Sequence, residues 1–182
     1  VMVYIASNLF IKKTEIPVNS EQTLKNVSIV IDPGHGGLDN GASAGSVNEA
    51  ELNLEISFAL KEELENRGAT VNLTREDGQD LTRRNHHYSK QDDMYLRVKK
   101  IDSFNSDYLI SVHLNSALSS SVWGSQVFYY NNSEKGKRLA NEIHESMKEI
   151  TGSSKVISGA DSRVLRATKT VGVLIDCRFI SN

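Results

Sequence analysis

Hydrophobic residues recur with two different periods along the chain, and these periods predict strands that alternate with helices. Short apolar or alternating runs predict strands at 27–31, 70–75, 107–113, 125–130 and 171–176. Apolar residues spaced three or four positions apart predict helices at 49–67 and 92–105, and a third helix capped by Ser133. Because such alternation is typical of α/β proteins, we predict a single α/β domain with a mixed, mainly parallel sheet and helices on both faces.

Two details refine the predicted helices. Gly68 follows the first helix, at the position where a helix end favours a left-handed residue. The third helix has one apolar face, the side that a helix turns toward a core. This face is formed by Leu139, Ile143, Met147 and Ile150.

The first predicted strand runs into a glycine-rich stretch, IDPGHGGLDNGAS, which contains His35. Three further polar residues stand at the carboxyl ends of predicted strands: Asp32, His113 and Asp176. Open α/β sheets bind their ligands beyond these strand ends. The glycines allow sharp turns there and keep bulk away from whatever His35 contacts.

Several kinds of site do not fit this stretch. It has no G-K-[ST] and leads into no helix directly, which excludes a P-loop, and it lacks the G-x-G-x-x-G dinucleotide pattern. The chain matches G-x-S-x-G at residues 41–45, but these residues do not join a predicted strand directly to a helix, as a nucleophile elbow requires. Its one cysteine, Cys177, follows a buried strand and is interpreted as a core thiol.

A metal site fits the pattern better. His35 and His113 stand at strand ends, and Glu49 opens the first helix; two imidazoles and a carboxylate suit zinc or non-haem iron. Each residue alone also has an ordinary explanation, since a glutamate in a first helical turn favours the helix dipole and buried histidines are common. His86 and His87 lie in a polar loop and are interpreted as solvated, and His144 as structural or exposed.

Net charge and the length of the apolar N-terminal stretch bear on which partners the chain can bind. The 182 residues carry a formal net charge of −2, which gives no sign of nucleic-acid binding. The apolar stretch VMVYIASNLFI is too short to span a bilayer. Residues 1–26 are therefore interpreted as an N-terminal arm, or as the remnant of a trimmed signal peptide or anchor with its linker.

Six motifs occur in order between residues 27 and 182: IDPGHGG, NEAELNL, LTR, LRVKKID, DYLISVHLNS and VGVLIDCRFISN. Together they resemble the zinc-dependent N-acetylmuramoyl-L-alanine amidases of the amidase-3 family, and among these the germination-specific amidases of spore-forming bacteria. The resemblance implies that 27–182 is an amidase catalytic domain. It implies that His35, Glu49 and His113 bind Zn²⁺ and that Asp176 is the catalytic carboxylate.

The implied reaction is hydrolysis of the amide bond between N-acetylmuramic acid and L-alanine in peptidoglycan, during maturation of the spore cortex or germination. Zinc would activate water and polarise the carbonyl, and a nearby carboxylate would move the proton. The implied location is the cell wall or the spore envelope side of the membrane, after export. A regulatory protein partner fits the same picture, with membrane attachment only through an N-terminal anchor.

Three departures from the family pattern lie at the C-terminus. Asp176 replaces a glutamate, Arg178 replaces a glycine, and the chain stops at FISN where relatives commonly continue into a helix. Arg178 would strain a turn that needs positive φ, or would pair with Asp176 and lower its basicity. Two alternatives therefore stay open: a degenerate amidase that binds cell wall or a protein without cutting, and a related zinc hydrolase such as a carboxypeptidase.

Overall fold

The computed structural model describes residues 23–82, 89–116 and 123–180. The six-stranded sheet has the order β4-β1-β5-β8-β6-β7. Its strands are β1 (Ser28–Pro33), β4 (Thr70–Leu73), β5 (Tyr108–Asn115), β6 (Gln126–Tyr130), β7 (Ser158–Ala160) and β8 (Val171–Phe179). The β4, β1, β5 and β8 strands pair in parallel, and β6 runs antiparallel to β8. The predicted mixed, mainly parallel sheet is confirmed.

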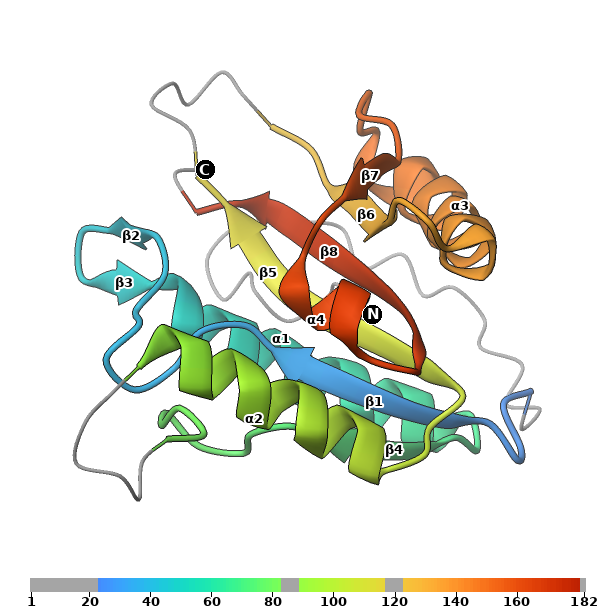
Figure 1. The fold of residues 1–182 in the computed structure, drawn as a ribbon. Helices are drawn as coiled ribbons and strands as arrows, with labels where there is room; N and C mark the ends of the chain where they lie inside the picture. Colours follow the sequence, from blue (N-terminus) through green and yellow to red (C-terminus); the bar gives the residue numbers. More distant parts are fainter. Residues whose placement is uncertain (1–22, 83–88, 117–122, 181–182) are drawn as a thin grey trace.

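Helices cover both faces of this sheet, as predicted (Figure 1). The helices are α1 (Glu49–Asn66), α2 (Lys90–Ser103), α3 (Glu134–Thr151) and α4 (Arg163–Ala167). In the view of Figure 1, α2 and α4 lie in front of the sheet and α1 lies behind it. Apolar residues of α1 and α3 pack with Ile110 and Cys177, which places these two helices on the same face.

The helix ends follow the sequence signals. Ser133 caps α3 by accepting a hydrogen bond from the Gly136 amide, as predicted, and Asn48 caps α1 in the same way through the Glu51 amide. Gly68 has the positive φ, 93°, that was expected after the first helix. These local signals therefore set where α1 and α3 begin and where α1 ends.

The prediction of the apolar face of α3 is wrong at one position. Leu139, Ile143 and Met147 pack against the core formed by β6 and β8, whereas the Ile150 side chain is 67% exposed. Ile150 lies in the last turn of the helix, so the helical period continues beyond the sheet that the face covers. Four short elements were not predicted: β2 (Ser43–Ala44), β3 (Val47–Asn48), β7 and α4.

Buried charges join β1 to α2. Arg97 and Asp32 are both buried and lie 2.9 Å apart between Nη1 and Oδ1. Thr74 donates a second hydrogen bond to the same carboxylate, and Ser111 a third. Burial raises the pKa of Asp32, but the Arg97 guanidinium and the Thr74 hydroxyl outweigh it and hold the pKa below its ordinary value of 3.8.

Replacing Asp32 with asparagine should therefore lower the free energy of unfolding at pH 7 by about 3–5 kcal/mol, because Arg97 loses a buried partner. The folded-state pKa of Asp32 is depressed, so its stabilisation is present above about pH 4 and is lost as the pH falls through the folded-state pKa. Urea unfolding of both proteins from pH 7 to pH 3 checks this. A difference in stability that stays constant down to pH 3 would contradict it.

Within the described residues, no helix is long and apolar enough to cross a membrane.

Candidate metal centre

Three side chains from separate elements meet at the carboxyl end of the sheet. His35 follows β1, Glu49 is the first residue of α1, and His113 lies in β5. The His35 Nε2 atom lies 3.2 Å from Glu49 Oε1, and the His113 Nδ1 atom lies 3.0 Å from the same oxygen. One potential ligand atom of each residue lies within 4.8 Å of the others. The structure thus brings together the three residues that the sequence singled out.

The Glu49 carboxylate is fixed by the chain around it. The Ala42 amide donates to Oε2 at 2.9 Å and the Leu114 amide donates to Oε1 at 3.2 Å. Burial raises the pKa of Glu49, but hydrogen bonds from the imidazoles of His113 and His35 and from the Ala42 amide hold it well below its ordinary range. Glu49 therefore presents a fixed anion to the centre of the cluster.

A second carboxylate orients His35. The Asp39 Oδ2 atom lies 3.0 Å from His35 Nδ1, on the side of the ring opposite Glu49. Burial lowers the pKa of His35, but the carboxylates of Glu49 and Asp39 outweigh it and raise the pKa. A carboxylate behind a metal-binding imidazole fixes the ring and its tautomer. Sequence reasoning missed Asp39, although an acidic residue four positions after His35 was the available signal.

Glycines make room for the cluster at two positions. A Cβ atom on Gly34 would lie 2.3 Å from the His113 ring, and one on Gly41 would lie 2.5 Å from Glu49 Oε2. Gly41 also has a φ of 65°, in the left-handed region that favours glycine. The predicted role of the glycine-rich stretch, to keep bulk away from the residues that His35 contacts, is confirmed at these two positions.

The cluster fits a divalent cation. Two imidazole nitrogens and one carboxylate oxygen converge from a loop, a helix and a strand, and carboxylates flank His35 on both sides. Zinc and iron both accept this set of donors, and three protein ligands leave a position for water or substrate. His35, Glu49 and His113 could therefore hold a catalytic metal ion.

Asp176 lies beside this cluster on the next strand. In the parallel pairing of β5 and β8, Asp176 is the direct partner of His113. Burial raises the pKa of Asp176 to about 6; the positive charge of His113 partly opposes this, and the Glu49 carboxylate adds to it. Asp176 is therefore a more basic carboxylate than an exposed aspartate, as a proton acceptor near neutral pH requires.

The expected strain at Arg178 is wrong. Arg178 lies within β8, which continues to Phe179, and it is not among the residues with positive φ. The expected loss of basicity at Asp176 is also not observed, since its pKa is raised. β8 has a register shift against β5 between the His113–Asp176 and Asn115–Phe179 pairs, and Arg178 is accommodated in this irregular part of the strand without a positive φ.

The remaining candidate residues have structural surroundings. Arg75 is buried and donates to backbone carbonyls. Cys177 packs against apolar residues, and burial raises the pKa of its thiol to about 12. His144 is buried on α3. The Asn115 side chain accepts a hydrogen bond from the Ser116 amide. His86 and His87 lie outside the described residues.

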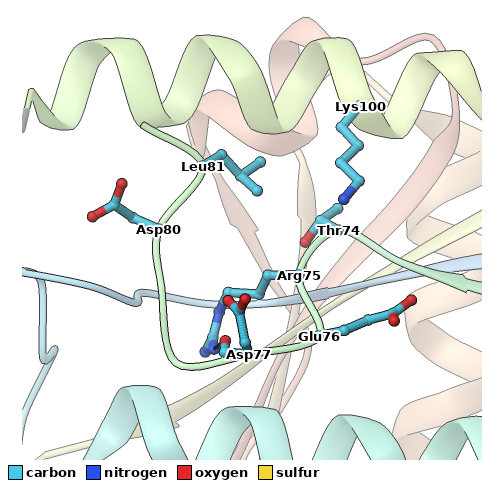
Figure 2. Close-up of a pocket in the computed structure, with 7 residues that line it drawn as sticks. All are labelled: Thr74, Arg75, Glu76, Asp77, Asp80, Leu81 and Lys100. Carbon is cyan, nitrogen blue, oxygen red and sulfur yellow. Dashed lines mark hydrogen bonds between the residues drawn. The ribbon is translucent and has the colours of Figure 1, made fainter. Parts of the chain in front are cut away.

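A polar pocket of about 320 Å³ opens next to the loop that follows β4 (Figure 2). Its lining residues are Thr74, Arg75, Glu76, Asp77, Asp80, Leu81 and Lys100. Figure 2 shows the Arg75 side chain extending alongside Asp77, so acidic and basic groups share this pocket. None of His35, Glu49 or His113 lines it, and the cluster at the strand ends is the better candidate for catalysis.

An open α/β sheet with two imidazoles, a glutamate and a basic aspartate at its carboxyl edge has the arrangement of a metal-dependent hydrolase. Comparison with known proteins makes this more specific. Residues 29–182 match the family described as N-acetylmuramoyl-L-alanine amidase, and the chain belongs to that family. The resemblance that the ordered motifs indicated is thereby confirmed.

Relatives and solved structures agree with this assignment. The chain is 34% identical over 161 residues to the germination-specific N-acetylmuramoyl-L-alanine amidase of Bacillus subtilis, covering 85% of this chain and 67% of that protein. It is 32% identical over 180 residues to the probable cell wall amidase LytH of Staphylococcus saprophyticus, covering 97% of this chain but 55% of the relative. The chain thus spans only about half the length of LytH.

A solved structure shows the same fold. The CwlD amidase from Clostridioides difficile, determined in complex with the GerS lipoprotein, matches with a TM-score of 0.78 and 31% sequence identity. The match covers 86% of this chain and 84% of that chain. The predicted fold class is therefore confirmed by a relative as well as by the sheet order.

Proposed function

We propose that this chain is a zinc-dependent N-acetylmuramoyl-L-alanine amidase that hydrolyses the amide bond between N-acetylmuramic acid and L-alanine in peptidoglycan. The observation that carries the proposal is the convergence of His35, Glu49 and His113 within 4.8 Å, with Asp176 paired to His113 on the adjacent strand. Family membership supports the substrate class, and the germination-specific relative supports a role in spore cortex maturation or germination.

In this proposal His35, Glu49 and His113 hold Zn²⁺. When bound, zinc supplies a Lewis acid that polarises a carbonyl and lowers the pKa of water. Glu49 contributes the negative charge, since its low pKa keeps it ionised at neutral pH. The Asp39 carboxylate lies 3.0 Å from His35 Nδ1, and the other ring nitrogen, Nε2, faces Glu49 at the centre of the cluster. Zinc is proposed over iron because the family resemblance implies it.

Asp176 serves as the general base and then as the general acid. Its carboxylate accepts the proton of the attacking water and afterwards donates that proton to the leaving nitrogen of L-alanine. In the metal-free protein, burial gives Asp176 a pKa of about 6, so its carboxylate is a better proton acceptor than that of an exposed aspartate.

The experiment that tests the proposal is incubation of the zinc-loaded chain with purified peptidoglycan, with mass spectrometry of the released fragments. We expect stem peptides with a free N-terminal L-alanine, which disappear when a chelator removes the metal and return when zinc is added. Fragments produced by cleavage of a different bond would instead indicate a related hydrolase. If folded, zinc-loaded protein releases no product, the second candidate is favoured, a cell-wall-binding domain without activity. The observation behind this candidate is that the Asp176 side chain is shorter than the glutamate of the family pattern.

Replacing Asp176 with glutamate is expected to raise kcat, because the extra methylene brings the carboxylate closer to the reacting atoms. A misplacement of about 1 Å can cost roughly a hundredfold in rate. Steady-state rates on the same muropeptide at equal zinc content measure the effect. A rate equal to or below that of the unmodified protein would show that β8 already places Asp176 correctly.

The proposal extends to domains, partners and location. The catalytic domain comprises residues 27–182. Peptidoglycan is the substrate, and the chain acts after export, at the cell wall or spore envelope. A regulatory protein partner is supported by the CwlD relative, whose structure was determined with the GerS lipoprotein.

A further inference from the structure

A buried arginine on α2 holds the backbone of the loop that carries His35. Arg97 has no exposed surface, and its Nε donates to Asp93 Oδ2 at 2.7 Å. Its Nη1 donates to Asp32 Oδ1 at 2.9 Å and to the Pro33 carbonyl at 2.8 Å. Its Nη2 donates to the carbonyl of His35 itself. All three nitrogens of the guanidinium are therefore in use, and two of them bind this loop.

Arg75 binds the same loop from a different direction. Its Nε donates to the Pro33 carbonyl at 3.0 Å, and its Nη2 donates to the Gly34 carbonyl at 3.0 Å. The carbonyls of three successive residues, 33 to 35, thus accept hydrogen bonds from buried guanidinium groups. Arg97 alone reaches the third of these carbonyls among the bonds of the described residues.

The backbone of His35 needs such support. Its φ is 62°, in the left-handed region that residues with a Cβ seldom adopt. Its neighbours Gly36 and Gly37 also have positive φ, so they impose little restraint of their own. A strained conformation persists only where the surrounding structure holds it. The bond from Arg97 to the His35 carbonyl acts at this residue directly.

The first turns of α2 contact the loop that follows β4 and, at one further point, the His35 loop. Asp93 binds Arg97 through one oxygen and accepts a hydrogen bond from the Leu81 amide through the other, at 2.9 Å. Lys90 lies 3.6 Å from Asp39 Oδ2, the carboxylate behind the His35 ring. The α2 helix therefore contacts the backbone of His35 through Arg97 and the carboxylate beside its imidazole through Lys90.

We propose that Arg97, held by Asp93 and Asp32, is a positioning residue that keeps His35 in its left-handed conformation and so sets the metal affinity of the cluster. This inference rests on the metal site of the proposed function, but on neither the substrate nor the reaction. The α2 helix then acts as the support of one ligand, while Glu49 and His113 are held by α1 and β5.

Arg97→Lys is the sharpest variant for a test. Lysine keeps the positive charge between Asp32 and Asp93, but a single ammonium group lacks the planar fork that reaches two carboxylates and two carbonyls together. Losing a partner of a metal ligand typically weakens metal binding 10- to 100-fold. We expect a loss of about this size in the zinc affinity of Arg97→Lys, measured by competition with a chromogenic chelator.

Ile101→Ala is the matched control. Ile101 is fully buried one turn further along α2, and it packs with Leu109 and Val164 instead of the His35 loop. Its truncation removes core packing and lowers stability without touching the guanidinium. Measured at a temperature where both variants are fully folded, Ile101→Ala should keep the zinc affinity of the unmodified chain.

A second readout needs no metal. The imidazole resonances of His35 in metal-free protein should shift in Arg97→Lys and stay in place in Ile101→Ala. Equal zinc affinity in Arg97→Lys and the unmodified chain would overturn the inference, as would an equal loss in both variants. If Arg97→Lys does not fold, the test uses Asp93→Asn, which removes the carboxylate that holds the Arg97 Nε atom. Weaker zinc binding in Asp93→Asn supports the inference, and unchanged binding overturns it. Absence of zinc binding by the unmodified chain would instead refute the proposed metal site.

Discussion

Replacing Asp176 with asparagine is expected to lower kcat for release of stem peptides by about 10²–10⁴-fold, the range that general acid–base catalysis contributes. Asparagine has nearly the same shape as aspartate and fits the same place on β8, but it cannot accept the proton of water. The proposed metal ligands His35, Glu49 and His113 are untouched, so zinc content should remain that of the unmodified chain. Rates on a defined muropeptide and zinc measured on the same sample check both expectations.

The comparison that makes this result specific is Cys177→Ala. Cys177 follows Asp176 in β8 but packs against apolar residues on the side of α1 and α3. Its truncation perturbs the same strand without removing a proton acceptor. A loss of rate as large in Cys177→Ala as in Asp176→Asn would indicate a disturbed strand. Full activity of Asp176→Asn would assign the base to another group.

Alanine at His35 or at His113 is expected to abolish stoichiometric zinc binding and, with it, activity. Each variant leaves two protein ligands, and catalytic zinc sites take three. The Glu49 carboxylate also loses one of the two imidazoles that hold its pKa down. Zinc content after dialysis against a weak chelator measures the effect.

His144→Ala serves as the control for these variants, since His144 is a buried histidine on α3 and lies outside the cluster. It should retain one zinc per chain even if the protein is less stable. Normal zinc content in both His35→Ala and His113→Ala would contradict the ligand assignment.

The sequence predicted those parts of the fold that periodicity and capping specify. The strands that form β1, β5 and β8 are continuous apolar runs because both faces of the sheet are covered by helices. Short elements such as β7 and α4 carry too few residues for a period to appear. Ile150 continues the apolar face of α3 in the sequence, but a period does not say where the sheet beneath it stops.

The candidate site was predictable to the same degree. His35, His113 and Asp176 follow or end apolar strands, so the topology of a parallel sheet brings them to one edge. Arg97 was not identified as part of the site because its role depends on contacts across the fold, whereas Asp39 was overlooked although it lies only four positions after His35. Arg97 is 62 residues from the His35 carbonyl that it binds, and in the sequence it resembles any charged residue of an exposed helix.

The antiparallel direction of β6 has a consequence for how such a domain can diversify. Gln126, the first residue of β6, pairs with Asp176, and β5 ends two residues beyond His113. The connection from β5 to β6 therefore leaves from one site residue and returns to the neighbour of another. A sequence change in this connection therefore acts next to both His113 and Asp176, while the pairing of β5 with β8 does not depend on it.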